Sequence, residues 1–204
     1  MPNRLSFGSA FGSAIALVAC LGMASTAIAQ TDACGKVTKK IAKEMGATQD
    51  AFNAKKWDEV LAKASEIEAN PIEKSEFDKF WLNEFKGVAN TSLKKYAEAL
   101  PQLEATMASP CMDPASKPNR TKVLMQLAYS QKQYPKAIEY GNQALGFNWD
   151  PEVAIYVGNA YYIGNDYQNT KRIMSEVVTK QEAAGTIPEE PAAETLAYHD
   201  DRVV

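Results

Sequence analysis

Residues 157–174 read VGNAYYIGNDYQNTKRIM, and this stretch decides the fold. Gly158 and Tyr161 lie on one helical segment, Asn165-Asp166 follows as a turn, and Tyr167 opens a second helical segment. Asn and Asp favour turns, and the apolar residues on either side recur at helical spacing. The stretch therefore predicts two antiparallel helices joined by a short turn.

The aromatic residue that opens the second segment recurs along the chain. Three residues after each aromatic stands a small or β-branched residue, and a further apolar or small residue follows four positions later. The aromatics are 39, 38 and 33 residues apart, near the period of about 34 that paired-helix solenoids show. The four aromatics are Trp57, Tyr96, Tyr134 and Tyr167. The repeat predicts an all-α superhelical solenoid of antiparallel helix pairs.

Four pairs are expected between residues 37 and 187, because prolines and polar turns divide the periodic segments. The glycines of the first helices, Gly87 and Gly158, would let the paired helices approach closely, and Ala99 and Ala137 are expected to face them. The expected helices cover 37–54, 57–69, 75–91, 96–108, 119–132 and 134–147, followed by one that begins at Asp150 and one over 167–184.

The first 29 residues differ from the rest of the chain. Arg4 is their only charged residue, and an apolar run diluted by Gly, Ser and Ala ends in Ala27-Ile28-Ala29. This pattern is typical of a secretory signal peptide cleaved between Ala29 and Gln30. It predicts a periplasmic or secreted protein with a polar lead over residues 30–36. An alternative is lipidation at Cys20, which follows Leu17-Val18-Ala19 and would make the protein a lipid-anchored assembly factor of the envelope.

Two cysteines remain after such a cleavage, Cys34 and Cys111. An exported protein reaches an oxidising compartment, where disulfides persist. The helix order puts Cys34 before the first helix of pair one and Cys111 after the second helix of pair two, at the same edge of the array. The two cysteines could pair there or remain free thiols.

Several segments resemble the tetratricopeptide repeat family. The match is best at Val157-Gly158-x-x-Tyr161 with Tyr167, and partial at Ala137-x-x-x-Gly141-x-x-Ala144 and at Ala99-x-x-x-Leu103. The whole chain is also similar to exported, largely uncharacterised tetratricopeptide proteins of Gram-negative bacteria. The resemblance implies a scaffold that binds another protein, and it predicts that residues 188–204 form a short terminal helix or tail.

The family's register places the first helix of each pair on the inner face of the array, where a peptide or helix of a partner would bind. The residues at these positions mix aromatic side chains with amides, as protein-binding surfaces do. Packing between repeats explains the aromatic ones nearly as well. The candidate partner-binding residues are Gln49, Phe52, Trp81, Glu84, Lys122, Gln126, Tyr129, Asn159 and Tyr162.

The sequence contains no recognisable catalytic or cofactor-binding motif. His199 is the single histidine, so neither a histidine-based metal site nor a Ser-His or Cys-His arrangement is predicted. No Gly-rich phosphate loop is present, and no cofactor is predicted. The net charge of −3 disfavours nucleic acid as a partner, and no later segment is apolar enough to span a membrane. We expect a protein-binding scaffold with no catalytic residues, and an enzyme is the least favoured alternative.

Overall fold

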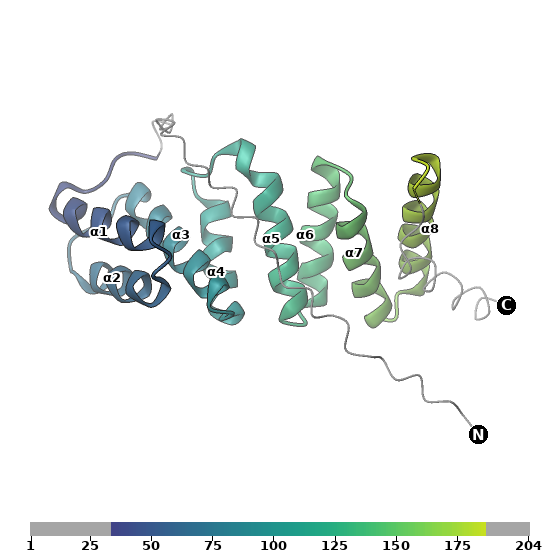
Figure 1. The fold of residues 1–204 in the computed structure, drawn as a ribbon, viewed down its shortest axis with the longest axis horizontal. Coiled ribbons are helices and arrows are strands. Elements are labelled where there is room, and N and C mark those ends of the chain that lie inside the picture. The colour runs from purple at the N-terminus through teal and green to yellow at the C-terminus, as the bar shows by residue number, and fades with distance from the viewer. Residues whose placement is uncertain (1–33, 187–204) are drawn as a thin grey trace, which may run out of the picture.

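The computed structural model describes residues 34–186, and this part of the chain is a row of helices without strands. The predicted signal peptide, Cys20, His199 and the terminal segment 188–204 lie outside the described residues. Figure 1 shows the helices side by side along one axis, with their directions turning gradually along the row. The elements are η1 (Lys39–Ile41), α1 (Ala42–Asn53), α2 (Trp57–Ala69), α3 (Glu76–Ser92), α4 (Tyr96–Ala108), η2 (Pro114–Ser116), α5 (Lys117–Ser130), α6 (Tyr134–Phe147), α7 (Pro151–Ile163) and α8 (Tyr167–Ala183).

The helices form four antiparallel pairs, α1/α2, α3/α4, α5/α6 and α7/α8, and each pair packs on the next. The predicted fold class is confirmed: the protein is an all-α solenoid of antiparallel helix pairs. The core is divided among successive groups of buried side chains, one around α1–α3, one around α4–α6 and one around α6–α8. Such a quasi-linear core results when each repeat contacts only its neighbours.

One turn geometry joins the two helices of every pair. The residue after the helix cap adopts a left-handed conformation with φ between 56° and 61°. The next backbone N–H then donates to a carbonyl five residues back, as from Lys95 to Asn90 at 2.7 Å. This is a Schellman motif, which satisfies the last carbonyls of a helix. The left-handed residues are Lys55, Lys94, Lys132 and Asn165.

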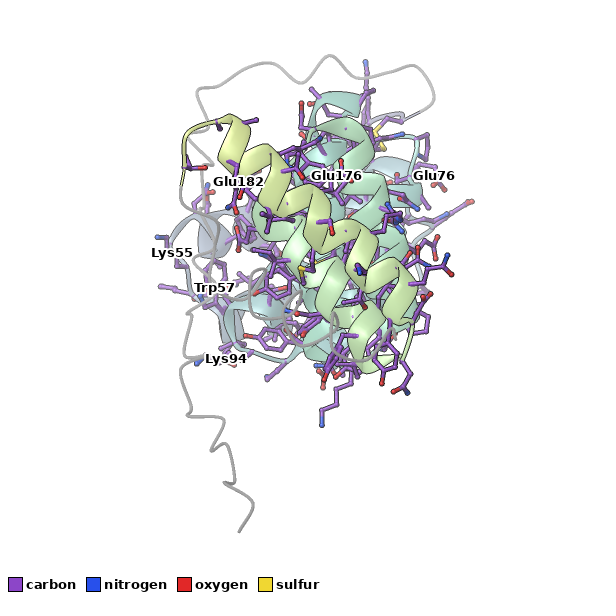
Figure 2. All side chains as sticks on the ribbon, turned by 90° about the vertical axis from the view of Figure 1, so that its right-hand side faces the viewer. Lys55, Trp57, Glu76, Lys94, Glu176 and Glu182 are labelled. Carbon is purple, nitrogen blue, oxygen red and sulfur yellow. A yellow bond between two sulfur atoms is a disulfide. The ribbon has the colours of Figure 1, made fainter. Side chains whose placement is uncertain are left out.

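The aromatic residues that open the second helices lie directly after these turns. Trp57 contacts Phe52 with ring centroids 5.6 Å apart, and Tyr134 contacts Tyr129 at the same distance. Each contact joins the end of a first helix to the start of its own second helix. The repeated aromatic therefore closes the pair from which it comes. In Figure 2, Lys55, Trp57 and Lys94 lie on one side of the molecule, at this turning edge, and Glu76 lies on the opposite side.

The helix starts follow the expected capping chemistry. Ser75 and Asp78 form a reciprocal capping box at α3, with Asp78 in place of the more frequent Glu. Asp150 caps α7 by accepting from the N–H groups of Glu152 and Val153. Helix α5 begins at Lys117, two residues before the predicted start, because Pro118 is tolerated in a first turn, where its missing N–H costs nothing.

Small residues allow close packing within the pairs, and large side chains of the second helices lie nearest to the glycines. A Cβ at Gly87 would lie 2.4 Å from Leu103, and one at Gly158 would lie 2.5 Å from Met174. Leu103 lies one helical turn after Ala99 on α4, and Ala99 is itself fully buried. A glycine leaves a hollow, and a large side chain of the second helix fills it, which keeps the packing dense.

Candidate functional site

The candidate surface is the inner face, which we define as the side chains of α1, α3, α5 and α7 that point away from the second helices. Helix α1 packs on α3, and α5 packs on α7, in addition to the contacts inside each pair. In these two places the first helices contact each other directly, and we call their side of the row the inner one. The nine predicted partner-binding residues belong to these four helices.

Phe52 belongs to the core rather than to an open surface. Its side chain is 8% exposed and contacts Phe85 of α3, with ring centroids 5.3 Å apart. Trp81 is half-buried and packs against the same cluster, with its ring 5.6 Å from that of Phe85. Packing between the first two repeats, the alternative reading of these aromatics, accounts for Phe52.

Glu84 forms an ion pair that links α3 to α5. Its carboxylate accepts two hydrogen bonds from Nη2 of Arg120, at 2.6 and 2.7 Å, and both side chains are 14% exposed. A partly buried pair of this kind holds the two helices in one arrangement, since removing one partner leaves an uncompensated charge. Sequence reasoning missed Arg120, because nothing in its local pattern reveals a partner 36 residues away.

Lys122 links α5 to α7 in a similar way. Its Nζ donates to Asp150 at 2.8 Å and to Glu152 at 3.0 Å. Burial alone would lower the pKa of Lys122, but the two carboxylates outweigh it and raise that pKa. Burial likewise opposes ionisation of Asp150, yet hydrogen bonds from Lys122 and from two backbone N–H groups lower its pKa. Lys122 and Asp150 therefore form an ion pair in which each favours the charged form of the other.

Tyr129 continues the link between α5 and α7. Its ring meets that of Tyr156 edge-on, with centroids 5.1 Å apart, and burial is the main cause of its raised pKa. Tyr162, at the same position one repeat later, is 36% exposed and contacts Tyr167 with centroids 5.8 Å apart. The inner face thus offers more of its aromatic surface near the end of α7 than near the end of α5.

The three remaining predicted residues are amides. Gln49 is exposed, and Gln126 and Asn159 are half-buried on α5 and α7. Within residues 34–186, no hydrogen bond engages the side-chain amide of any of the three. The structure therefore places the predicted residues on the four first helices, where Phe52 is buried, the charged residues are paired and the amides make no hydrogen bond to the described chain.

A strap of residues 34–38 fastens the start of the array to the second pair. Cys34 forms a disulfide with Cys111, in the loop after α4, with Cα atoms 4.7 Å apart. Ser75 donates from Oγ to the carbonyl of Lys36, and Thr38 donates to Asp78. Of the two alternatives for the cysteines, the structure shows the paired one.

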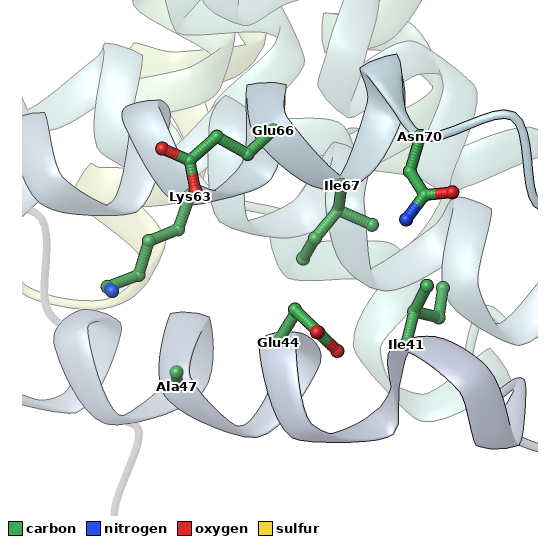
Figure 3. A pocket seen from close by; sticks show the side chains of 7 residues that line it. All are labelled: Ile41, Glu44, Ala47, Lys63, Glu66, Ile67 and Asn70. Atoms are coloured by element: carbon green, nitrogen blue, oxygen red, sulfur yellow. The ribbon is translucent and has the colours of Figure 1, made fainter.

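A crevice of about 260 Å³ lies between α1 and α2, in the first helix pair of the row. Figure 3 shows Lys63 and Ile67 reaching from α2 toward α1, where Ala47 and Glu44 stand. In the following repeats, the corresponding surface of the first helix packs on the preceding pair. The crevice holds none of the predicted site residues, and its mixed charges suit the solvated end of a solenoid.

Two kinds of feature, a cluster of metal-ligating side chains and a membrane-spanning helix, are absent from the described part of the chain. Among residues 34–186, no three His, Cys, Asp or Glu side chains are placed to hold a metal ion. No helix in the same range is long and apolar enough to cross a membrane.

Comparison with known proteins yields a structural likeness to solved structures. No protein-family model and no curated protein matches the chain. Among solved structures, it is similar to one titled "MamA MSR-1 C2", with 13% sequence identity and a TM-score of 0.44. The match covers 82% of this chain and 100% of the other.

Proposed function

We propose that this protein is an exported scaffold that binds a peptide or helix of another protein on its inner face. The observation that carries the proposal is that some residues of that face hold the repeats together while others make no hydrogen bond inside the protein. Phe52, Glu84 and Lys122 hold neighbouring repeats together, whereas the amides of Gln49, Gln126 and Asn159 make no hydrogen bond within the described chain. A rigid surface with unused polar groups and an exposed tyrosine suits binding without catalysis.

The disulfide supports an extracytoplasmic location for this scaffold. Cys34 and Cys111 lie 77 residues apart in sequence, and their bond joins the N-terminal strap to the second pair. Such bonds persist in the periplasm and outside the cell, and they are rare in the cytosol. Together with the predicted signal peptide, this favours the periplasm or the medium as the place of work.

Site-specific crosslinking in the native envelope tests the proposal. Tyr162 is replaced by p-benzoylphenylalanine, and Gln168, an exposed residue of α8 outside the inner face, is replaced likewise as a control. We expect a discrete crosslinked partner from position 162 that is absent from position 168. Identical products from the two positions, or none from position 162, would reject the inner face as the binding surface.

A further inference from the structure

Four lysines gather at the start of the array, on the strap and on the helical turns that follow it. Lys36, Lys39, Lys40 and Lys43 lie close together in sequence, and Glu44 is the only acidic residue between positions 34 and 49. All four lysine side chains are exposed. We call these four residues the lysine patch.

The helical part of the patch turns its lysines away from the core. Lys39 and Lys43 are four residues apart, and Lys40 and Lys43 are three apart, so the three share one side of the segment formed by η1 and α1. Ile41 and Met45 are buried on the other side. The three lysines therefore lie on the outer side of the first helix.

Lys36 also points outward, from the strap. Successive side chains of an extended chain point to opposite sides. Val37 packs against the core cluster of the first repeats, whereas Lys36 beside it is exposed. Helix α1 packs on α2 and α3 and stands at one end of the row in Figure 1. The lysine patch thus occupies the end of the array.

No carboxylate of residues 34–186 forms an ion pair with the patch. Several basic residues farther along are paired, for example Lys86 with Glu68 at 2.7 Å. None of the four patch lysines takes part in any such pair among the described residues. Glu44, the nearest acid in sequence, lines the crevice between α1 and α2, and the four lysines do not. The patch therefore presents positive charge that the described chain does not compensate.

The strap fixes the patch before any partner arrives. Its disulfide joins it to the loop after α4. Ser75 donates from Oγ to the carbonyl of Lys36 at 2.8 Å, and the N–H of Thr38 donates to Asp78 at 3.2 Å. A segment that is already ordered loses less conformational entropy on binding. The lysines therefore project from a backbone held in one conformation.

The composition of the patch suits lipid phosphates better than a protein surface. Protein interfaces are enriched in aromatic residues, Met and Arg and are depleted in Lys. Lys carries a compact point charge, and clusters of lysines draw proteins to anionic membrane surfaces. The large hydrophobic side chains exposed in the described chain belong to its last two helix pairs, so the patch brings charge without an apolar anchor. Such a surface fits adsorption at the headgroups rather than insertion.

We propose that the lysine patch holds the first helix pair against a bilayer surface rich in anionic phospholipids, with its lysines at the level of the headgroup phosphates. Charges more than about 8 Å away are screened at physiological ionic strength, so the patch acts locally although the chain has a net charge of −3. Each Lys near such a surface strengthens binding about fivefold. This inference is independent of binding on the inner face.

Sedimentation of sucrose-loaded vesicles with the exported protein tests the proposal. One set of vesicles contains equal parts of phosphatidylglycerol and phosphatidylcholine, and the other contains phosphatidylcholine alone. The measured quantity is the ratio of the two partition constants, which removes any binding that does not depend on lipid charge. The patch variant combines Lys36→Gln, Lys39→Gln, Lys40→Gln and Lys43→Gln.

A matched control loses the same charge elsewhere. It combines Lys55→Gln, Lys94→Gln, Lys95→Gln and Lys132→Gln, at four exposed lysines of the turning edge. Circular dichroism and thermal unfolding confirm that both variants are folded. Because the two variants have the same net charge, a difference between them reports the position of the lysines.

We expect the parent protein to prefer the anionic vesicles and to lose that preference as salt is added. The patch variant should have a partition ratio lower by at least about tenfold, since it removes four charges near the surface. The control variant should bind like the parent protein.

Three outcomes would overturn the inference. The first is a partition ratio of one for the parent protein, and the second is an equal loss in both variants, which would show that net charge alone is responsible. The third is patch-dependent binding of polyglutamate without binding of the anionic vesicles, which would make an acidic protein segment the occupant. None of these outcomes changes crosslinking from position 162, so the proposed function is tested separately.

Discussion

Thr38 donates two hydrogen bonds to the carboxylate of Asp78, from its backbone N–H at 3.2 Å and from its hydroxyl at 2.5 Å. Asp78 is fully buried and also accepts from the N–H of Ser75 at 2.9 Å. One carboxylate thus caps α3 and anchors the strap that precedes α1. A buried acceptor with several donors is costly to remove, since each donor loses its partner.

Asp78→Ala should lower the free energy of unfolding by about 2–4 kcal/mol, because it removes a helix cap and leaves half-buried donors of Ser75 and Thr38 without their acceptor. Asp78→Asn retains one carbonyl acceptor and should cost less. Urea unfolding followed by circular dichroism measures both. Asp58→Ala, at an exposed residue of α2, is the control. A loss for Asp78→Ala no larger than that of the control would contradict the role of Asp78.

Gly87→Ala and Gly46→Ala should have opposite effects, although both replace a glycine inside a first helix. The added Cβ at position 87 would lie 2.4 Å from Leu103, whereas at position 46, apart from the adjoining residues and the backbone of the same helix, no described atom lies within 4 Å. Overpacking should cost about 1–3 kcal/mol at position 87. The better helix propensity of Ala should add about 0.5–1 kcal/mol at position 46. Thermal and urea unfolding compare the two, and equal effects would contradict the close approach of α3 and α4.

Lys94→Gly should stabilise the protein by about 0.5–1 kcal/mol, because glycine adopts the left-handed conformation without the steric cost that a Cβ brings. Lys94 has φ of 60°, whereas its neighbour Lys95 has φ of −84° and serves as the matched position. Lys95→Gly should be neutral or destabilising. Stabilisation by both substitutions, or by neither, would show that the turn conformation is not the cause. Urea midpoints at fixed slope provide the measurement.

Reduction of the Cys34–Cys111 bond should destabilise the protein by about 4 kcal/mol in the chain-entropy model, because the bond closes a long loop in the unfolded chain. Urea unfolding with and without dithiothreitol measures this difference. The double variant Cys34→Ser/Cys111→Ser should unfold like the reduced protein and should not respond to the reductant. A response of the double variant, or no response of the parent protein, would contradict the prediction.

The free energy of unfolding should decrease at acidic pH, in part because the carboxylate of Asp150 becomes protonated. Its pKa is lowered in the folded protein despite burial, because Lys122 and the N–H groups at the start of α7 favour the charged form. A group whose folded pKa lies below its unfolded value contributes stability that is complete above the unfolded pKa, about 4, and is lost as pH falls through the folded pKa. Asp150→Asn can still cap α7 but does not titrate there.

Urea midpoints of the parent protein and of Asp150→Asn, measured between pH 7 and pH 2.5, test this effect. The gap between the two proteins should be largest near neutral pH and should shrink below pH 4. A constant gap over the whole range would contradict the assignment.

Much of the scaffold could be predicted because its signals are local and repeated. The turn of each pair needs a residue that can adopt a left-handed conformation and an aromatic that closes the pair, and both recur near Lys55, Lys94, Lys132 and Asn165. The prolines and caps that separate the pairs act within a few residues of chain. Sequence spacing alone therefore reveals the helix pairs and the residues that lie on the first helices.

The site could be predicted only as a set of positions. Phe52 and Tyr162 share one repeat position, yet Phe52 is buried against α3 and Tyr162 is 36% exposed. That difference depends on the next repeat, which supplies Phe85 for Phe52. The sequence predicts that Glu84 is available to a partner, whereas in the structure it is paired with Arg120. Sequence position does not show which long side chains contact each other between neighbouring helix pairs.

The sequence by itself determined that this protein is a row of four helix pairs, because helix periodicity and turn chemistry act over short distances. Only the tertiary structure decided that Leu103 fills the hollow at Gly87, that Cys34 pairs with Cys111, and that Glu84 and Lys122 are neutralised. These contacts join residues 16 to 77 positions apart, and the stacking and twist of successive pairs bring them together.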